Sequence, residues 1–230
     1  MTSIRSRPTA PFPQRGGPQR GRRRGVVRWL VLASMATVSA APPDSPGLPR
    51  TGIFGLEASG RRYVYVFDRS ASMGDPDGRP LATAKRELLR SIDRLTESQQ
   101  FHVIFYNHRV HVFAPVGLQG RPLFATEGNR REAGRFIEGV RADGGTGHAA
   151  ALAAAFRLRP DVVFMLTDAD AGDDLTAEDA RRLERLVGGA ALQLVRFAGP
   201  AAAPSPRLET LCDRSGGQRL VIDPLAIADE

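Results

Sequence analysis

The amino-acid sequence predicts an α/β fold, a three-layer sandwich in which a doubly wound, mostly parallel sheet of about six strands carries helices on both faces. Two short segments, Tyr63–Phe67 and Val162–Leu166, contain only apolar and aromatic residues and lack the polar alternation of a half-exposed strand. Runs of this kind are typical of strands buried on both faces of a parallel sheet. Along the rest of the chain, segments with apolar residues at helical spacing alternate with strand-like segments, as in βαβ units.

The first half of the predicted fold starts with the strand Tyr63–Phe67. Pro80 then suits the first turn of a helix. The apolar stripe of this helix has spacings of three and four residues and consists of Leu81, Ala84, Leu88, Ile92 and Leu95. A second strand covers Phe101–Tyr106. The short connection after it leads to Val110–Phe113, which indicates a hairpin and therefore one antiparallel edge strand.

The second half continues the alternation. The next amphipathic helix is marked by Ala133, Phe136, Ile137 and Val140. A Gly-rich loop follows, and then an Ala-rich helix from His148 to Phe156, whose small side chains allow it to lie close to the sheet. After the strand Val162–Leu166, Thr176 is expected to cap a helix, with Asp179 three residues on. The remaining expected elements are a strand at 192–197, a helix around 208–212 and a strand at 220–222.

The regions outside this alternation predict a modular chain. We expect a basic disordered tail at 1–25 and an apolar signal-peptide core or membrane anchor at 26–41. A Pro-rich linker with its lead-in is expected at 42–58. The folded domain is expected at 59–224, and a short tail at 225–230. The apolar stretch is shorter than the roughly 20 residues of a spanning helix. It fits a secretory signal cleaved after Ala40, and a retained anchor is the alternative. We therefore expect the domain outside the cytoplasm, in the periplasm or cell envelope; a cytoplasmic protein with a basic tail is the other interpretation.

The net charge of +7 invites a nucleic-acid interpretation, but the charge is unevenly distributed. Residues 1–50 contain nine arginines and one acid, Asp44, so they carry +8 and the other 180 residues carry −1. The folded domain thus has no electrostatic footprint for nucleic acid. The single cysteine, Cys212, excludes an intrachain disulfide and a multi-cysteine metal site. It follows Leu208 and Leu211 at helical spacing and is expected in the core.

Oxygen-bearing side chains follow the buried strands. Asp68, Ser70 and Ser72 come directly after the first strand, and Asp168 follows the strand that begins at Val162. Thr146 lies in the Gly-rich loop. Ligands of an open α/β sheet bind just beyond the carboxyl ends of the strands. If the two buried strands are neighbours, the two carboxylates lie side by side there, and a divalent cation between them relieves their repulsion.

Taken in order, Asp-x-Ser-x-Ser at 68–72, Asp-Gly-Gly-Thr at 143–146 and Leu-Thr-Asp at 166–168 resemble the metal-ion-dependent adhesion site (MIDAS) of the von Willebrand factor type A (VWA) domain. The resemblance spans roughly Arg61 to Asp223, including the hairpin strand and the Ser-Gly-Gly before the last strand. It is more specific than any one motif, because Asp-x-Ser-x-Ser alone also suits a turn or a helix N-cap.

The resemblance implies a metal centre formed by Asp68, Ser70, Ser72, Thr146 and Asp168. The two serine hydroxyls would bind the metal directly, Thr146 directly or through water, and the two aspartates mostly through water. Mg²⁺ is the expected ion, with Mn²⁺ or Ca²⁺ as alternatives. Because few ligands would be negative, the ion keeps an open position that an Asp or Glu carboxylate of a partner protein would complete.

Two departures from the family pattern concern neighbouring residues. Ala169 and Asp170 stand where many family members have a glycine, and Asp173 and Asp174 add further negative charge. These acids are interpreted as solvated loop or helix N-terminal charges; the alternative is that one of them tightens metal binding or competes with the incoming carboxylate. His148 is expected as a polar residue at a helix start, or at the rim of the site.

The leading functional hypothesis is a metal-dependent protein-binding module rather than an enzyme. A hydrolase that uses the same cation is the first alternative. The sequence contains no GxxxxGK[ST], GxGxxG or GxSxG motif, and Ser70 stands where a phosphoaspartyl hydrolase needs a second aspartate. The second alternative is a scaffold with a silent metal site, tethered to a membrane through residues 26–41 or acting through its basic tail.

Overall fold

The computed structural model describes residues 49–115, 120–168, 171–199, 203–224 and 226–227. The basic tail, the apolar stretch at 26–41 and the first part of the linker lie outside the described residues. Within the described residues no helix is both long and apolar enough to cross a membrane.

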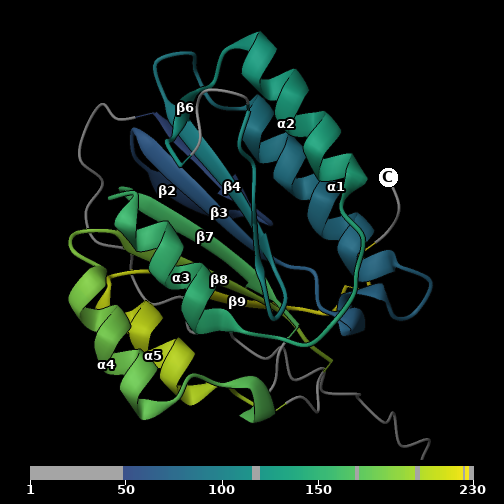
Figure 1. Ribbon diagram of the computed structural model, residues 1–230, viewed down its shortest axis with the longest axis vertical. Helices are drawn as coiled ribbons and strands as arrows, with labels where there is room; N and C mark the ends of the chain where they lie inside the picture. Colours follow the sequence, from purple (N-terminus) through teal and green to yellow (C-terminus); the bar gives the residue numbers. More distant parts are fainter. Residues whose placement is uncertain (1–48, 116–119, 169–170, 200–202, 225, 228–230) are drawn as a thin grey trace, which may run out of the picture. The chain divides into compact units, whose positions relative to one another are not determined.

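The described residues form a mixed seven-stranded sheet with helices on both faces (Figure 1). The strand order is β5-β4-β3-β7-β8-β9, and β6 pairs with β4. The four parallel pairings join neighbours among β4, β3, β7, β8 and β9. These strands cover Arg62–Asp68 (β3), Gln100–Tyr106 (β4), Val162–Thr167 (β7), Ala191–Phe197 (β8) and Arg219–Ile222 (β9). The predicted fold class is therefore confirmed.

The antiparallel strands lie at one side of this sheet. Val110–Val112 (β5) pairs antiparallel with β4, which confirms the predicted hairpin edge strand. Leu123–Phe124 (β6) also pairs antiparallel with β4 and was not predicted, since two residues are too few to show a periodicity.

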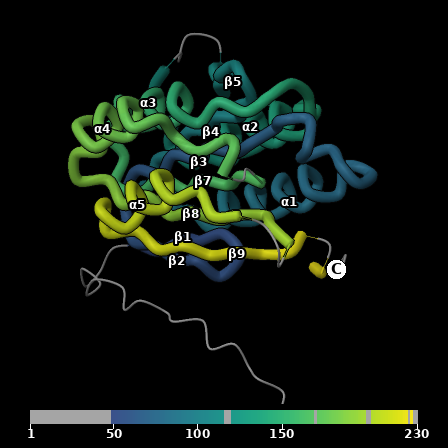
Figure 2. Tube along the Cα trace, turned by 90° about the horizontal axis from the view of Figure 1, so that it is seen from below, coloured from purple at the N-terminus to yellow at the C-terminus, as the bar shows by residue number. Residues whose placement is uncertain are grey.

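A separate antiparallel hairpin precedes the sheet. It consists of Arg50–Ile53 (β1) and Leu56–Ser59 (β2). The lead-in expected within 42–58 is thus part of a hairpin, with a turn at Phe54 and Gly55, whose φ angles are 49° and 81°. Two consecutive positive φ angles suit the two-residue turns of hairpins. Phe54 packs edge-on against Phe197, with ring centroids 5.5 Å apart, and Figure 2 shows the hairpin beside β8 and β9.

Two helices cover one face of the sheet and three cover the other (Figure 1). Arg79–Asp93 (α1) and Glu127–Gly139 (α2) pack on the first face, and His148–Arg157 (α3), Ala177–Leu186 (α4) and Pro206–Arg214 (α5) pack on the second. Thr126 and Thr176 accept hydrogen bonds from the backbone N–H three residues on and cap α2 and α4.

The central strand β3 explains the two cores. Tyr63, Tyr65 and Phe67 point into the core under α1 and α2, while Val64 and Val66 point into the core under α3, α4 and α5. Small residues such as Ala151 and Ala155 let α3 approach the sheet closely. All of these side chains are buried, and so is Cys212, as predicted. Because β3 pairs in parallel with both β4 and β7, the carboxyl ends of these three strands lie side by side at one end of the sheet, which we call the carboxyl edge.

Candidate metal centre

Asp68 is the last residue of β3 and lies beside Tyr106 at the end of β4. Its side chain is fully buried. Its Oδ1 accepts a hydrogen bond from the backbone N–H of Ser70 (2.8 Å), and its Oδ2 accepts one from the hydroxyl of Thr167 (2.7 Å). Burial raises the pKa of this carboxyl, although the hydrogen bonds oppose the shift. The carboxyl group is thus fixed in one orientation at the sheet edge.

The two serines of the motif converge beside this carboxyl group. Their hydroxyl oxygens lie 3.1 Å apart, although Ser70 is buried and Ser72 is exposed. The short 3-10 helix Ala71–Gly74 (η1) brings them together, and the fully buried side chain of Met73 anchors this turn in the core. In an extended chain these two side chains would lie on the same face but about 7 Å apart, so the tight turn is what brings the two hydroxyls within hydrogen-bond distance of each other.

The Gly-rich loop is joined to the Asp68–Ser72 segment by backbone hydrogen bonds. The N–H of Asp143 donates to the carbonyl of Arg69, and the N–H of Ala71 donates to the carbonyl of Gly144, both over 2.9 Å. Gly144 has a φ of 71°, and a Cβ there would lie 2.5 Å from Nδ1 of His108. Only glycine allows this approach. These bonds hold the backbone of the loop at the carboxyl ends of the strands. Thr146, two residues after Gly144, is half-buried.

Asp168 follows the last residue of β7, the strand that pairs with β3. Burial and the nearby Asp68 raise the pKa of its carboxyl to about 6, while a hydrogen bond from the Ser72 side chain opposes the shift. Its Oδ1 is buried and has no hydrogen-bond partner among the described residues. A buried carboxylate oxygen without a partner is costly unless a ligand or ion satisfies it.

The structure therefore brings Asp68, Ser70, Ser72 and Asp168 together at the carboxyl ends of the strands and holds the backbone of the loop that carries Thr146 beside them. The predicted donor set suits a metal ion. Two carboxylates and three hydroxyls are hard oxygen donors, the kind that Mg²⁺ prefers. The part of the chain that the structure describes holds no group of three or more His, Cys, Asp or Glu side chains that could bind a metal. This centre does not require one, because three of its five candidate donors are hydroxyls. The role of each residue as a ligand stays a prediction.

Two further residues of the site, Thr167 and Tyr106, were not recognised from the sequence, and a third, His148, was expected at the helix start or at the rim of the site. The hydroxyl of Thr167 holds Asp68, as described above. The hydroxyl of Tyr106 lies 3.4 Å from Oδ2 of Asp68 and 2.9 Å from Nδ1 of His148. His148 begins α3 as predicted, but it is buried behind the site rather than at its rim, and burial lowers its pKa to about 4. Tyr106 is the last residue of β4, and an aromatic residue in a buried strand is ordinarily a core residue.

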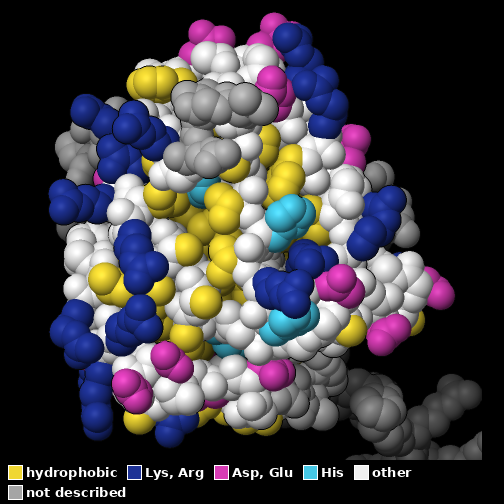
Figure 3. Space-filling view, viewed as in Figure 1, with side chains coloured by type: hydrophobic (Ala, Val, Ile, Leu, Met, Phe, Trp, Pro, Cys, Tyr) yellow, Lys and Arg dark blue, Asp and Glu magenta, His cyan; other side chains and the backbone are white. Residues whose placement is uncertain are grey.

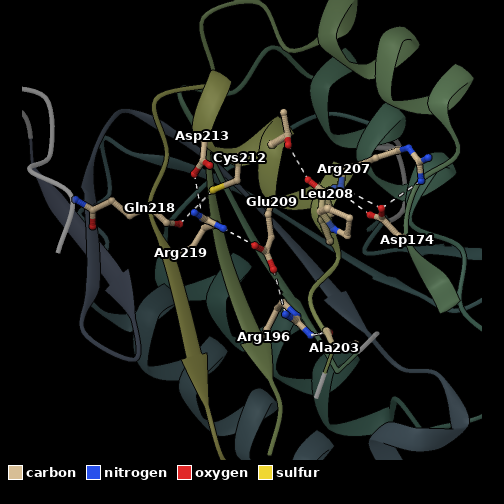
Figure 4. Close-up of polar contacts among 12 residues, drawn as sticks. Asp174, Arg196, Ala203, Arg207, Leu208, Glu209, Cys212, Asp213, Gln218 and Arg219 are labelled. Carbon is tan, nitrogen blue, oxygen red and sulfur yellow. Dashed lines mark hydrogen bonds and ion pairs between the residues drawn. The ribbon is translucent and has the colours of Figure 1, made fainter. Parts of the chain in front are cut away.

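The neighbouring acids do not act alike. Asp170 lies outside the described residues, and Asp173 is exposed. Asp174 is buried at the start of α5, where its carboxylate accepts the backbone N–H groups of Arg207 and Leu208, both over 3.0 Å (Figure 4). Asp174 is thus a helix N-terminal charge, as interpreted, but not a solvated one. Its bonds join the segment after β7 to α5.

The other histidines lie outside the centre. His108 and His111 are exposed around the hairpin that contains β5, whereas His102 lies within β4 and is buried.

No protein-family model and no curated protein matches the chain. Among solved structures, the chain is similar to a von Willebrand factor type A protein from Catenulispora acidiphila, with 23% identity and a TM-score of 0.61 over 74% of this chain and 41% of that one. It is also similar to the conserved hypothetical protein BatB from Bacteroides thetaiotaomicron, with 18% identity and a TM-score of 0.53 over 71% of this chain and 91% of that one.

A third similar structure is proximal thread matrix protein 1 from the mussel byssus with a zinc-occupied MIDAS motif, with 17% identity and a TM-score of 0.53 over 72% of this chain and 42% of that one. The chain thus spans less than half the length of the first and third of these proteins. At these identities the likeness concerns the fold. Together with the strand order described above, it shows that this chain has the von Willebrand factor type A fold.

Proposed function

We propose that this domain is a metal-dependent protein-binding module. Asp68, Ser70, Ser72, Thr146 and Asp168 would hold a Mg²⁺ ion at the carboxyl edge of the sheet. The bound ion would supply a Lewis-acidic position that accepts a carboxylate oxygen from an Asp or Glu of the partner protein. The observation that carries this proposal is the buried Oδ1 of Asp168, which has no partner among the described residues and lies in a site with a second buried carboxyl group.

The chain's own residues support binding in two ways. Thr167 and the backbone of Ser70 hold Asp68, so no large rearrangement is needed to present its oxygens. Hydroxyls make up three of the five donors, so the metal charge is only partly neutralised and the ion still attracts a partner's carboxylate. Tight anionic ligation would weaken this attraction. The likeness to a structure with a zinc-occupied MIDAS motif supports the metal assignment, although Mg²⁺ remains part of the proposal.

The test is an affinity capture with the purified full chain as bait, performed in Mg²⁺ and again with a chelator. We expect partners that elute with the chelator, and that are lost with Asp68→Ala and Ser70→Ala. Ser98→Ala is the matched control, because Ser98 bonds Thr96 and lies far along the chain from the motif. Circular dichroism shows whether each variant is folded. Binding that resists the chelator and both variants would reject the proposal.

A hydrolase that uses the same cation is the competing proposal. The absence of the nucleophile and phosphate-binding motifs in the sequence favours binding. A panel of generic phosphoesters distinguishes the two: Mg²⁺-dependent turnover that disappears with Asp68→Ala would favour the hydrolase.

We also propose that the domain acts in the cell envelope, either exported or anchored through residues 26–41. This proposal rests on the apolar stretch and the basic residues before it. Protease treatment of intact cells and spheroplasts that express the full chain tests it. Protection of the domain in spheroplasts would contradict it.

A further inference from the structure

One rim of the metal centre is basic. The turn after β4 contains His108 and Arg109, and β4 ends beside Asp68. This turn packs on the Gly-rich loop, because a Cβ on Gly147 would lie 3.2 Å from the carbonyl oxygen of Asn107. The loop in turn is bonded to the Asp68–Ser72 segment. The turn therefore lies next to the loop that is bonded to the Asp68–Ser72 segment, at the same end of the sheet as the candidate metal site.

The charges on this rim are only partly compensated. Nη1 of Arg69 donates to the carbonyl of Arg141 (2.8 Å) and lies 3.0 Å from Oδ1 of Asp143. Asp143 also accepts from the side chain of Asn107. Arg109 and Arg141 are exposed, and neither forms an ion pair with any described carboxylate. We call Arg69, Arg109 and Arg141 the basic rim. One acid, Asp143, compensates Arg69. Arg109 and Arg141 have no paired carboxylate among the described residues, and Nη1 of Arg141 donates to the carbonyls of Glu138 and Val140.

Neighbouring groups are consistent with a positive potential at this rim. Burial lowers the pKa of Lys85 and the pKa of His111, and the positive charges of Arg141 and Arg69 respectively add to these two shifts, while Glu138 opposes the shift of Lys85. In Figure 3, basic and histidine side chains lie side by side on the visible face of the domain.

The opposite rim of the centre differs. The segment after β7 presents the exposed Asp173, while Asp174 is occupied at the start of α5. A ligand that approaches the metal thus meets positive charge on the side of β4 and negative charge on the side of α5. An evenly charged polyanion would be attracted by one rim and repelled by the other, whereas a peptide can match both.

We propose that the partner presents an acidic peptide segment in which a carboxylate that completes the metal shell is accompanied by one or two further acidic residues over Arg109 and Arg141. This inference rests on the proposed function and adds the chemistry of the partner to it. Exposed ion pairs of this kind contribute about a two- to fivefold gain in affinity each. The rim therefore selects among carboxylate-bearing partners rather than supplying most of the affinity.

The test measures fluorescence anisotropy of three labelled Gly-Ser peptides on the full chain in Mg²⁺. One peptide has a single Asp, the second has that Asp and two flanking Glu residues, and the third has two flanking Lys residues. We expect the Glu-flanked peptide to bind about five- to twentyfold more tightly than the single-Asp peptide, and the Lys-flanked peptide to bind most weakly. An Arg109→Ala/Arg141→Ala double variant should remove these differences and keep the Mg²⁺ dependence.

The matched control is the double variant Arg181→Ala/Arg182→Ala, which removes the same charge from exposed positions on α4. It should bind the three peptides as the unmodified chain does. Equal binding of the three peptides in Mg²⁺, or equal effects of the two double variants, would overturn this inference and leave the proposed function intact. If no peptide binds more tightly in Mg²⁺ than in chelator, the proposed function fails, and this inference fails with it. Tighter binding of a polyphosphate than of the Glu-flanked peptide would also overturn it.

Discussion

The strand β7 has an aspartate at each end, and the two have opposite surroundings. Asp161, just before the strand, has an Oδ2 that accepts the backbone N–H groups of Arg61 and Arg62 over 2.7 and 2.9 Å. Asp168, just after the strand, has a buried Oδ1 with no partner among the described residues and a pKa raised to about 6. One oxygen of the first carboxylate is satisfied by two backbone donors, and this side chain is exposed, so water can reach it as well. The second carboxylate is left for something the protein binds.

The comparison separates structural aspartates from binding ones by hydrogen-bond satisfaction, not by residue type or strand position. A carboxylate with its own donors stabilises the fold. A buried carboxyl group with an unsatisfied oxygen destabilises the metal-free fold, and this loss of stability is offset only when a cation binds. On this interpretation, substitution of Asp168 should weaken metal binding and stabilise the metal-free fold at neutral pH. Substitution of Asp161 should destabilise the fold and leave metal affinity unchanged.

The largest expected effect is on metal affinity. Asp168→Ala and Asp68→Ala should each weaken Mg²⁺ binding by about 100-fold, since each removes a carboxylate that holds the ion or its waters. Isothermal titration calorimetry measures this directly. Asp161→Ala should leave the affinity unchanged, and a loss of similar size in that variant would show that the distinction between the two ends is wrong.

The next effect concerns pH. The pKa of Asp168 is raised from 3.8 to about 6 in the folded protein, so its stabilising contribution is complete below pH 3.8 and is lost as the pH rises through 6. We expect Asp168→Asn to remove this loss, on the order of 1–2 kcal/mol after allowance for partial exposure of the group. Urea unfolding of the metal-free protein at pH 4.5 and 7.5 measures it.

The comparison between the variant and the unmodified chain is essential in this experiment. His148 has a pKa lowered to about 4, so its contribution is present above about pH 6.5 and lost as the pH falls through 4, which opposes Asp168 in the same interval. Both proteins contain His148, so its effect cancels in the difference. If the difference in unfolding free energy between the two proteins is the same at both pH values, the pKa of Asp168 is not raised in the metal-free fold.

A smaller effect is expected at the other end of β7. Asp161→Ala removes two hydrogen bonds to the backbone at the start of β3, and water can replace part of them because the site is exposed. We therefore expect a loss of about 1 kcal/mol in the free energy of unfolding. Thermal unfolding in chelator checks this value, and unchanged stability would mean that these bonds do not support the strand.

The smallest effect is expected behind the site. Tyr106→Phe removes a long hydrogen bond to Asp68 and should weaken Mg²⁺ binding only a few-fold. Tyr65→Phe is the matched control, since the Tyr65 hydroxyl bonds Ser91 at 2.8 Å in the other core. The control should lower stability and leave metal affinity unchanged. Equal metal affinities in the two variants would remove Tyr106 from the site.

The fold was predictable because its main strands and helices have strong periodicities. The buried strands β3 and β7 contain uninterrupted apolar runs, and α1 has a regular apolar stripe. The hairpin β1–β2 and the two-residue β6 were missed, since four or two residues rarely show a clear pattern. Their position depends on tertiary packing, such as the contact of Phe54 with Phe197.

The residues expected to hold the metal could be predicted from the sequence, whereas the residues that hydrogen-bond to them could not. Asp68 and Asp168 could be placed together, because parallel strands bring their carboxyl ends to one edge. Thr167 and Tyr106 could not be recognised, because their hydroxyls become site groups only through the register of β3, β4 and β7. The role of Asp174 depends in the same way on α5, which lies more than thirty residues further along the chain.

The most direct test of the central claim is the position of the metal. Anomalous diffraction from crystals of the full chain grown with Mn²⁺ locates the ion without reference to function. We expect one strong peak at the carboxyl edge of β3 and β7, within bonding distance of the Ser70 and Ser72 hydroxyls and close to Asp68 and Asp168. No peak there, or a peak only at another carboxylate such as Asp161, would contradict the claim.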